Sequence, residues 1–416
     1  MSNPPSKRHA VHSASTFRNM SRRARIGLAV GLAAVVAGCA QDAPQDTWDP
    51  AGENAQMIHD LQWPVFAIAG IVGVVVLSVV AFVIVKFRDR GQAMPEQTHG
   101  KPALEIALTI LPALILIGVA IPTVGTIMAL NDTDDTECIV NVTGQQWWWE
   151  IDYPAQDGCG EGISAPIVTS GQMIIPTDTN VLVRGTSRDV IHSWWIPRLN
   201  GKRDMVPGRV HTVRLQADEP GIYAGQCTEF CGLSHANMRM EVIALEADDF
   251  ETWKDKQLSD YVAPEPDTLA AAGESTYVAQ CSRCHQVDGL EDADGDPVIA
   301  RPDLNVYSGA APNLTWFMTR NTFAGATWDL LIPECREAVW EASPEEFGER
   351  YLEGVPETCL NSVDLREWLR NAPAKKPMYT DPEQLEETGG LPRGMPNLAL
   401  SEDQIDELVA YLLERQ

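Results

Sequence analysis

The chain has 416 residues, a formal net charge of −27 and nine cysteines. This length is enough for two or three domains. The acidic balance excludes a nucleic-acid-binding protein and favours cationic partners, whose rate of encounter an acidic surface raises. A surface that only keeps the protein in solution is the alternative.

The first 38 residues have the composition of an export signal. They hold six Lys and Arg and no acid, and their apolar run from Ile26 to Ala37 is too short to span a bilayer. Small residues directly before Cys39 resemble a bacterial lipoprotein cleavage box, so we expect residues 1–38 to be removed and Cys39 to be lipidated. Removal leaves 25 Lys and Arg against 58 Asp and Glu, a net charge of about −33. Ordinary signal cleavage or an uncleaved arm is the alternative.

Two long apolar runs follow an outer segment, 39–62. Val65–Val85 and Ile106–Leu130 carry no charge, and each is long enough to cross a bilayer as a helix. We expect membrane spans at 63–87 and 103–130. The loop between them, 88–102, and its edges are rich in Lys and Arg, which stay in the cytoplasm. Everything after Leu130 therefore lies in the periplasm of a bacterial inner membrane protein.

One acid, Glu105, stands where the second apolar run begins. An ionisable residue at the edge of a membrane is a functional candidate. A solvated acid that favours the start of a helix is the alternative.

The remaining chain predicts a β domain followed by a helical one. Residues 131–247 hold short β-rich runs between Gly, Pro and Asp turns, typical of an antiparallel β-sandwich or barrel. The charged residues 248–272 predict a linker with some helix. Residues 273–416 have helical patterns, and Ser401 with Gln404 predicts a capping box for the last helix.

Soft metal ligands gather near the middle of the chain. Two thiolates, one imidazole and one thioether fall within twelve positions, and a second imidazole lies upstream. This donor set suits a copper that transfers electrons. Two cysteines four residues apart can bridge two ions, which a single blue-copper site would not need. The sequence therefore predicts a dinuclear copper centre with candidate ligands His192, Cys227, Cys231, His235 and Met238.

A Cys-x-x-Cys-His motif, Cys281 to His285, indicates covalent haem. In c-type attachment both thiols, Cys281 and Cys284, bind the porphyrin, and His285 is one axial ligand. A redox or zinc-binding Cys-x-x-Cys is the alternative. Methionine as second ligand raises the potential for electron transfer. We expect Met395, which directly precedes the final amphipathic helix, with Met378 and then Met318 as alternatives.

The spacing within the haem region is long for a small cytochrome. We expect an insertion between His285 and Met395, in the segment that carries Cys335 and Cys359. Small cytochromes also tend to place a proline against the haem histidine. Pro312 is the candidate, with an ordinary turn proline as the alternative.

Four cysteines stand outside these motifs. An exported chain permits disulfides. The pairings Cys138–Cys159 and Cys335–Cys359 each fall within one predicted domain. Free buried thiols are the alternative.

Three consecutive indoles, Trp147 to Trp149, form the most aromatic stretch. Side chains alternate along a strand, so the three cannot all face one core. We expect at least one to be exposed or at an interface. A packing belt near the bilayer is the alternative.

Taken together, these motifs resemble subunit II of haem–copper cytochrome c oxidase. The resemblance rests on the two spans, the Gln-Trp-x-Trp stretch, His-Ser-Trp and Cys-x-Glu-x-Cys-x-x-x-His-x-x-Met. The added Cys-x-x-Cys-His domain is similar to the fused, caa-type version. The resemblance implies a multidomain fold: a two-helix transmembrane hairpin, an all-β cupredoxin barrel and an all-α class I cytochrome c domain.

The resemblance also implies roles for individual residues. It implies a dinuclear CuA centre in which Glu229 adds its backbone carbonyl to the five side-chain ligands, while the Glu229 carboxylate reaches a magnesium shared with subunit I. It makes Trp147 the residue through which electrons reach CuA and Glu105 the acid at the mouth of a proton path. The family usually has His where this chain has Gln145, which bears on local hydrogen bonding.

The activity implied is electron transfer within a respiratory enzyme. Cytochrome c, or another basic donor, reduces haem c, and electrons pass through CuA to subunit I, where oxygen becomes water. Subunits I and III are the implied partners. The copper and cytochrome subunit of a nitric oxide reductase is the alternative. A quinol oxidase subunit is disfavoured because those proteins lack the copper cysteines.

Overall fold

The structure is a computed structural model that describes residues 26–27, 43–91, 99–156, 158–159, 163–291, 298, 311–380, 383 and 393–416. It divides into two units, residues 1–44 and 45–416, and the elements described below belong to the second. Cys39 and nearly all of the predicted signal lie outside the described residues.

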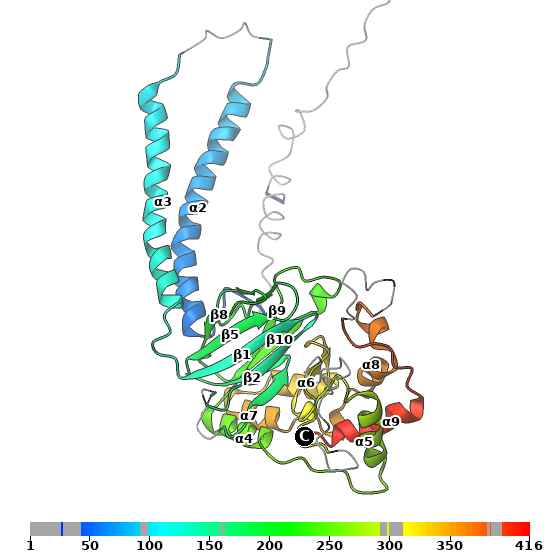
Figure 1. The fold of residues 1–416 in the computed structure, drawn as a ribbon. Helices are drawn as coiled ribbons and strands as arrows, with labels where there is room; N and C mark the ends of the chain where they lie inside the picture. Colours follow the sequence, from blue (N-terminus) through cyan, green and yellow to red (C-terminus); the bar gives the residue numbers. More distant parts are fainter. Residues whose placement is uncertain are drawn as a thin grey trace, which may run out of the picture. The chain divides into compact units, whose positions relative to one another are not determined.

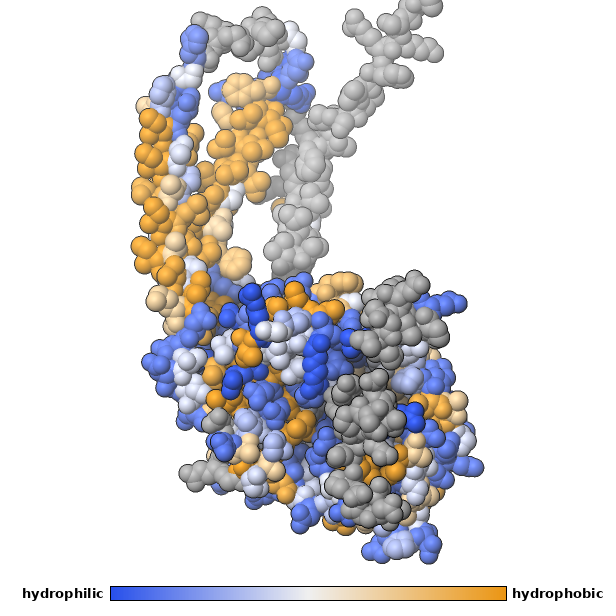
Figure 2. Space-filling view, in the orientation of Figure 1, coloured by the Kyte–Doolittle hydropathy of each residue, from blue (hydrophilic) through white to orange (hydrophobic). Residues whose placement is uncertain are grey.

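Two long apolar helices form an antiparallel pair, α2 (Glu53–Lys86) and α3 (Pro102–Leu130). Both are long and apolar enough to cross a membrane. Figure 2 shows a hydrophobic surface along both helices, with hydrophilic residues at the ends that meet the connecting loop. The α2 helix begins before the predicted span because the good helix formers among residues 53–62 extend it. Pro112 and Pro122 lie inside α3 without ending it.

The β domain contains two main sheets (Figure 1). The first has the order β3-β2-β1-β5-β8 and the second β4-β10-β9, while β6 and β7 form a separate ribbon. The strands are β1 (Cys138–Gln145), β2 (Trp148–Tyr153), β3 (Ile167–Ser170), β4 (Gln172–Pro176), β5 (Val181–Ser187), β6 (His192–Trp194), β7 (Arg203–Met205), β8 (His211–Leu215), β9 (Gly221–Gln226) and β10 (Arg239–Leu245).

Strand patterns explain the core of this domain. Buried and half-buried residues alternate along β1, as expected for a strand with one face on the core. The sheets are not purely antiparallel as predicted, because β1 pairs with β5, and β4 with β10, in parallel. Each parallel partner is reached by a long connection that includes strands of the other sheet, which removes the need for a hairpin turn. A disulfide joins Cys138 to Cys159.

The C-terminal region is mainly helical. Its described helices are α4 (Ala247–Gln257), α5 (Leu269–Gln280), α6 (Pro333–Trp340), α7 (Pro344–Leu352), α8 (Ser362–Lys375) and α9 (Glu402–Leu413), with short η4 (Phe317–Thr319) and η5 (Glu357–Cys359) and a ribbon of β11 (Thr322–Phe323) and β12 (Trp328–Asp329).

The first and last helices of this region, α5 and α9, pack closely. A Cβ atom on Gly273 would lie 2.0 Å from the backbone oxygen of Glu407, so a larger residue would push the helices apart. The rings of Tyr277 and Tyr411 lie 5.4 Å apart beside this crossing. The α5 helix begins inside the segment predicted as linker, because Thr268 caps it. The predicted capping box of Ser401 and Gln404 is present at α9.

The insertion expected before Met395 contains α6, α7 and η5. A disulfide joins Cys335 in α6 to Cys359 in η5. Both ends of the insertion lie close together, since the backbone N–H of Asn361 donates to the carbonyl of Leu330 over 2.7 Å. The chain therefore leaves the rest of the helical region at Leu330 and returns beside it at Asn361.

A buried polar network connects the β domain, which the sequence predicted as a sandwich or barrel, with the C-terminal region. The Gln172 amide in β4 donates to Glu241 in β10 over 2.7 Å and accepts the backbone N–H of Asn321 over 3.0 Å. The Tyr351 hydroxyl donates to the same amide oxygen over 3.3 Å. Because buried polar groups need such partners, these contacts join the two regions specifically.

Candidate metal centres

The two segments that carry the predicted copper ligands lie side by side. One is β6, which contains His192, and the other is the loop between β9 and β10. The backbone N–H of Cys227 donates to Met238 over 2.9 Å and closes the base of the loop. The N–H of Thr228 donates to Ser193 over 3.1 Å and ties the loop to β6. Backbone hydrogen bonds thus place donors about 34 residues apart in the sequence at one site.

All six predicted copper donors converge there. The two thiol sulfurs, Cys227 Sγ and Cys231 Sγ, lie 3.8 Å apart. Cys227 Sγ is 3.9 Å from His192 Nδ1 and 3.3 Å from the Glu229 carbonyl oxygen. Cys231 Sγ is 3.5 Å from His235 Nδ1 and 3.8 Å from Met238 Sδ. The paired sulfurs therefore form the centre, with one imidazole on each side.

The two thiols differ sharply in proton affinity. Hydrogen bonding between the two thiols lowers the pKa of Cys227. The same contact raises the pKa of Cys231. The pair therefore holds one proton between two sulfurs. Metal ligands must be deprotonated, so cation binding would release that proton.

Sequence reasoning missed the partner of His192. Asp189 Oδ1 lies 2.9 Å from His192 Nε2, and both side chains are almost fully buried. Burial lowers the pKa of His192, but the hydrogen bonds to Asp189 and Cys227 and the charges of these two groups together outweigh it, so the pKa is raised overall. With Nε2 held by a carboxylate, Nδ1 faces the thiols as a ligand atom. An acid behind a ligating imidazole is a usual orienting device in metal sites.

The space for the His192 ring comes from a glycine in β1. A Cβ atom on Gly144 would lie 2.8 Å from the ring carbon Cδ2 of His192. Trp149 packs against the same ring, with centroids 5.7 Å apart and planes at 64°. The aromatic stretch therefore supports a ligand as well as the core.

None of the three consecutive indoles is exposed. We expected at least one indole to be exposed or at an interface, and Trp147 lies between the β domain and the C-terminal region. Its Nε1–H donates to the Cys231 carbonyl over 3.0 Å, and its ring lies 5.3 Å from that of Tyr379 in the C-terminal region. Trp147 is thus joined directly to the backbone of Cys231, a predicted copper ligand.

The Cys-x-x-Cys-His motif stands at the end of α5. Cys281 caps the helix, and the N–H groups of Cys284 and His285 both donate to its carbonyl over 3.0 Å. His285 Nδ1 lies 2.7 Å from the carbonyl oxygen of Pro312, so the ring donates from Nδ1. Burial lowers the pKa of His285, which favours the neutral ring. Nε2 is then the unprotonated nitrogen, which can bind a metal.

Two of the three candidate methionines lie together. The backbone N–H of Met395 donates to the sulfur of Met378 over 3.3 Å. Met378 and Met318 are buried, whereas Met395 is half-buried. The Met378 sulfur therefore already has a hydrogen-bond donor.

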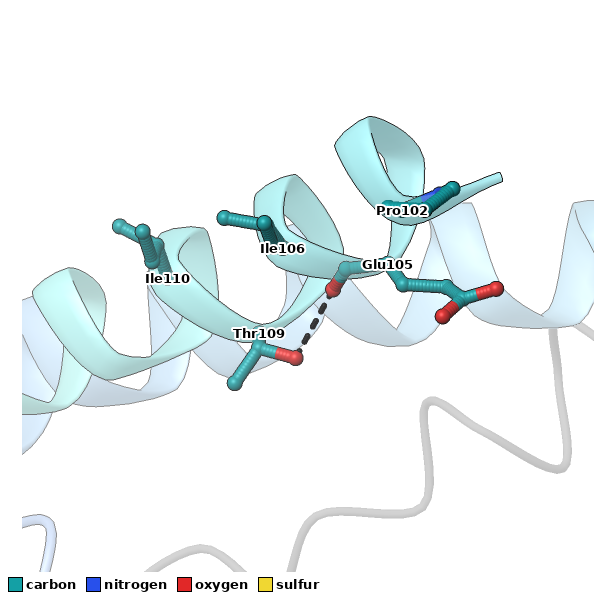
Figure 3. A pocket seen from close by; sticks show the side chains of 5 residues that line it. All are labelled: Pro102, Glu105, Ile106, Thr109 and Ile110. Carbon is teal, nitrogen blue, oxygen red and sulfur yellow. Dashed lines mark hydrogen bonds between the residues drawn. The ribbon is translucent and has the colours of Figure 1, made fainter. Parts of the chain in front are cut away.

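Glu105 lies in the first turn of α3. Together with Pro102, Ile106, Thr109 and Ile110 it lines a pocket on this helix (Figure 3). The Thr109 hydroxyl donates to the Glu105 carbonyl over 2.9 Å, while the Glu105 carboxylate points away from the helix. The Glu105 side chain is exposed, and its carboxylate lies beside Gly100 in the loop that precedes α3.

Comparison with known proteins now identifies the family. The family described as cytochrome C oxidase subunit II, periplasmic domain, matches residues 138–245, and the transmembrane domain of the same subunit matches residues 40–125. Cytochrome c oxidase subunit 2 of Alkalihalophilus pseudofirmus is 31% identical over 391 residues, which cover 92% of this chain and 94% of that protein. The chain belongs to the cytochrome c oxidase subunit II family.

Another subunit II supports the same match over nearly the full length. The subunit 2 of Bacillus sp. strain PS3 is 30% identical and covers 92% of this chain and 94% of its own length. A crystal structure of the periplasmic domain of subunit II from Bradyrhizobium japonicum is 26% identical and covers 29% of this chain and 94% of that chain, with a TM-score of 0.27.

As a subunit II, this chain is part of a haem–copper oxidase complex, with two spans in the inner membrane and its cupredoxin-like domain in the periplasm. The periplasmic domain family implies CuA copper. The residues present fit that group, because two thiols, two imidazole nitrogens, a thioether and a carbonyl oxygen meet at one point.

Proposed function

We propose that this chain accepts electrons from a soluble donor through its own covalent haem c and delivers them through a dinuclear CuA centre to subunit I. When bound, haem c and CuA supply two one-electron redox centres in series. Oxygen is the terminal acceptor in subunit I. The cytochrome c domain, residues 273–416, and the barrel, residues 131–247, are the parts of the chain that hold them.

The copper half of the proposal is supported by the convergence of the donors. His192, Cys227, Glu229, Cys231, His235 and Met238 are the proposed ligands, with Glu229 acting through its carbonyl. Asp189 orients His192. Backbone hydrogen bonds at the base of the loop keep these positions in place as the charge of the centre changes, which favours fast electron transfer.

The haem half is supported by one hydrogen bond above all. His285 Nδ1 donates to Pro312, which leaves Nε2 for iron, directly after the two thiols of Cys281 and Cys284. The close crossing of α5 and α9 adds the helix pair expected of a small cytochrome c. Met395 is the proposed second axial ligand, since the Met378 sulfur already accepts the N–H of Met395.

Several further roles follow from the family resemblance. We place a magnesium, shared with subunit I, at the Glu229 carboxylate and the mouth of a proton path at Glu105. Subunits I and III are the proposed partners in the membrane. A basic cytochrome c is the proposed donor because the chain carries a net charge of −27. Export with lipidation of Cys39 remains part of the proposal.

The test is a purification of the whole complex, followed by two assays. Haem staining of the denatured subunit should detect covalent haem on this chain, and the Cys281→Ala variant should weaken the stain. The complex should consume oxygen with reduced cytochrome c as donor. Absence of covalent haem would refute the cytochrome assignment, and uptake of nitric oxide in place of oxygen would refute the terminal acceptor.

A further inference from the structure

The segment from Lys376 to Tyr379, which follows α8, lies against the loop between β9 and β10. This loop, residues 227–238, carries most of the proposed copper ligands and is called the copper loop. Lys376 is 3% exposed, and its Nζ donates to the carbonyls of Trp147 over 2.8 Å and Ala324 over 2.7 Å. The Ser234 hydroxyl in the copper loop donates to the Pro377 carbonyl. These bonds join the C-terminal region to the barrel beside Trp147.

A buried lysine is costly unless its ammonium group is hydrogen-bonded. Lys376 reaches two carbonyls because Gly325 leaves room for it. A Cβ atom on Gly325 would lie 2.7 Å from the Trp147 oxygen and 3.0 Å from Lys376 Nζ, and its φ of +77° favours glycine. Burial lowers the pKa of Lys376 to about 7. The contact is therefore a specific one, built from three separated parts of the chain.

The same segment connects the proposed haem ligand with the copper loop. Met395 donates its N–H to the sulfur of Met378. Tyr379 follows directly in the chain, and its ring contacts that of Trp147 at 5.3 Å with planes at 44°. Trp147 then donates to the carbonyl of the copper ligand Cys231. Two hydrogen bonds, one ring contact and a short stretch of backbone thus span the two centres.

We propose that Lys376–Tyr379 is a docking clamp that holds the C-terminal region on Trp147, and that the Tyr379 ring carries electrons from the haem side to the copper loop. The inference rests on the proposed function, because it needs haem c and CuA. The step moves one electron from reduced haem c to the oxidised copper pair, with no bond formed or broken and no proton transferred.

The clamp has a second consequence. Trp147 is only 2% exposed, because the chain's own segment covers it. A soluble cytochrome therefore has no access to Trp147 while the clamp is closed. External donors must deliver electrons to the haem.

Docking is tested by hydrogen exchange, which needs no turnover. In Lys376→Met the methionine keeps the apolar stem of the side chain but lacks the amine and both of its hydrogen bonds, so amide exchange in residues 230–236 should rise about tenfold, as in local opening. Lys375→Met is the matched control, since Lys375 Nζ pairs with Glu367 within α8 at 2.7 Å. Unchanged exchange in Lys376→Met would overturn the clamp.

The electron pathway is tested in the purified complex by a one-electron reducing pulse, followed through the optical bands of haem c and CuA. Tyr379→Leu should slow transfer between them by about tenfold to a hundredfold, the range expected when reacting groups lose their placement. Its haem c and CuA spectra should match those of the unmodified complex. Tyr379→Phe keeps the ring and should retain most of the rate.

The outcomes separate the two proposals. A wild-type rate in Tyr379→Leu, with normal spectra, would overturn the role of the ring and leave the proposed function intact. A wild-type chain without covalent haem or without a CuA band would instead refute the proposed function.

Discussion

The proposed copper loops and the proposed haem region differ in how much of each site the polypeptide builds by itself. In the barrel, donors from two segments already face one another, and backbone hydrogen bonds close the loop that carries most of them. In the C-terminal region, the proposed attachment cysteines directly precede His285, and His285 Nδ1 lies 2.7 Å from the Pro312 carbonyl oxygen. There Met395 contacts Met378 through its backbone N–H.

The size of the bound group explains this difference. Copper ions are small and bind side chains that a folded barrel already positions. The proposed haem would fill the centre of its domain, so burial of the group would be part of folding, as for other metal-dependent domains. Copper loss should therefore leave the barrel folded, while haem loss should unfold the C-terminal region.

Removal of the haem attachment is expected to have the largest effect. The double variant Cys281→Ser and Cys284→Ser should destabilise residues 273–416 by more than about 4 kcal/mol, the stabilisation that a tightly bound ligand gives. Limited proteolysis should cut this region and spare residues 138–245. Ser282→Ala, inside the same motif, is the control. A protease-resistant C-terminal region in the double variant would show that this region folds without haem, contrary to the proposed difference between the two sites.

Removal of the disulfide in the insertion tests whether the C-terminal region unfolds separately from the β domain. Cys335 and Cys359 are 24 residues apart in sequence, so the double change to serine should cost about 3 kcal/mol through a less constrained unfolded state. Urea denaturation should show the loss for the C-terminal region only. An equal loss in the barrel would show that the two regions unfold as one.

Substitution of Asp189 tests whether the position of His192 is already fixed before copper binds. Asp189→Asn should weaken copper binding by about tenfold to a hundredfold, the usual effect of losing such a partner. Asp204→Asn, an exposed acid on β7, is the matched control. Copper titration of both variants gives the measurement, and equal affinities would show that His192 needs no orienting partner.

The buried Glu241 gives the smallest effect and a pH signature. Burial raises the pKa of Glu241, so its folded-state pKa lies above the unfolded value. The stability it contributes is present below the unfolded pKa and is lost as the pH rises through the folded pKa. Glu241→Gln should therefore raise Tm by about 2–4 °C at pH 8. At pH 4 the gain should vanish; a gain that does not depend on pH would assign the effect to packing.

Residue type and spacing were enough to predict the donor set that meets in the β domain and to propose a haem site in the C-terminal region. The copper donors form a short cluster with a distinctive set of atoms, and His285 follows two attachment cysteines. The amphipathic pattern and capping box predicted α9. These signals come from residues close together in the chain, so a single sequence is enough to detect them.

The remaining features depend on contacts between distant parts of the chain. Asp189 gives no signal, because an acid three residues before a histidine is common in loops. The parallel pairing of β1 with β5 depends on the route of the chain through the second sheet. The cover on Trp147 comes from Lys376 and Tyr379, about 230 residues later. The aromatic run predicted an interface but could not identify its other side.

The most direct test of the central claim is electron paramagnetic and optical spectroscopy of the purified complex, with the Cys227→Ser variant beside it. The wild type should show a two-copper signal in which one unpaired electron is shared, together with the spectrum of covalent haem c. Cys227→Ser should lose the copper signal and keep the haem spectrum. A copper signal that persists unchanged in Cys227→Ser would contradict the assignment of this loop as the CuA site.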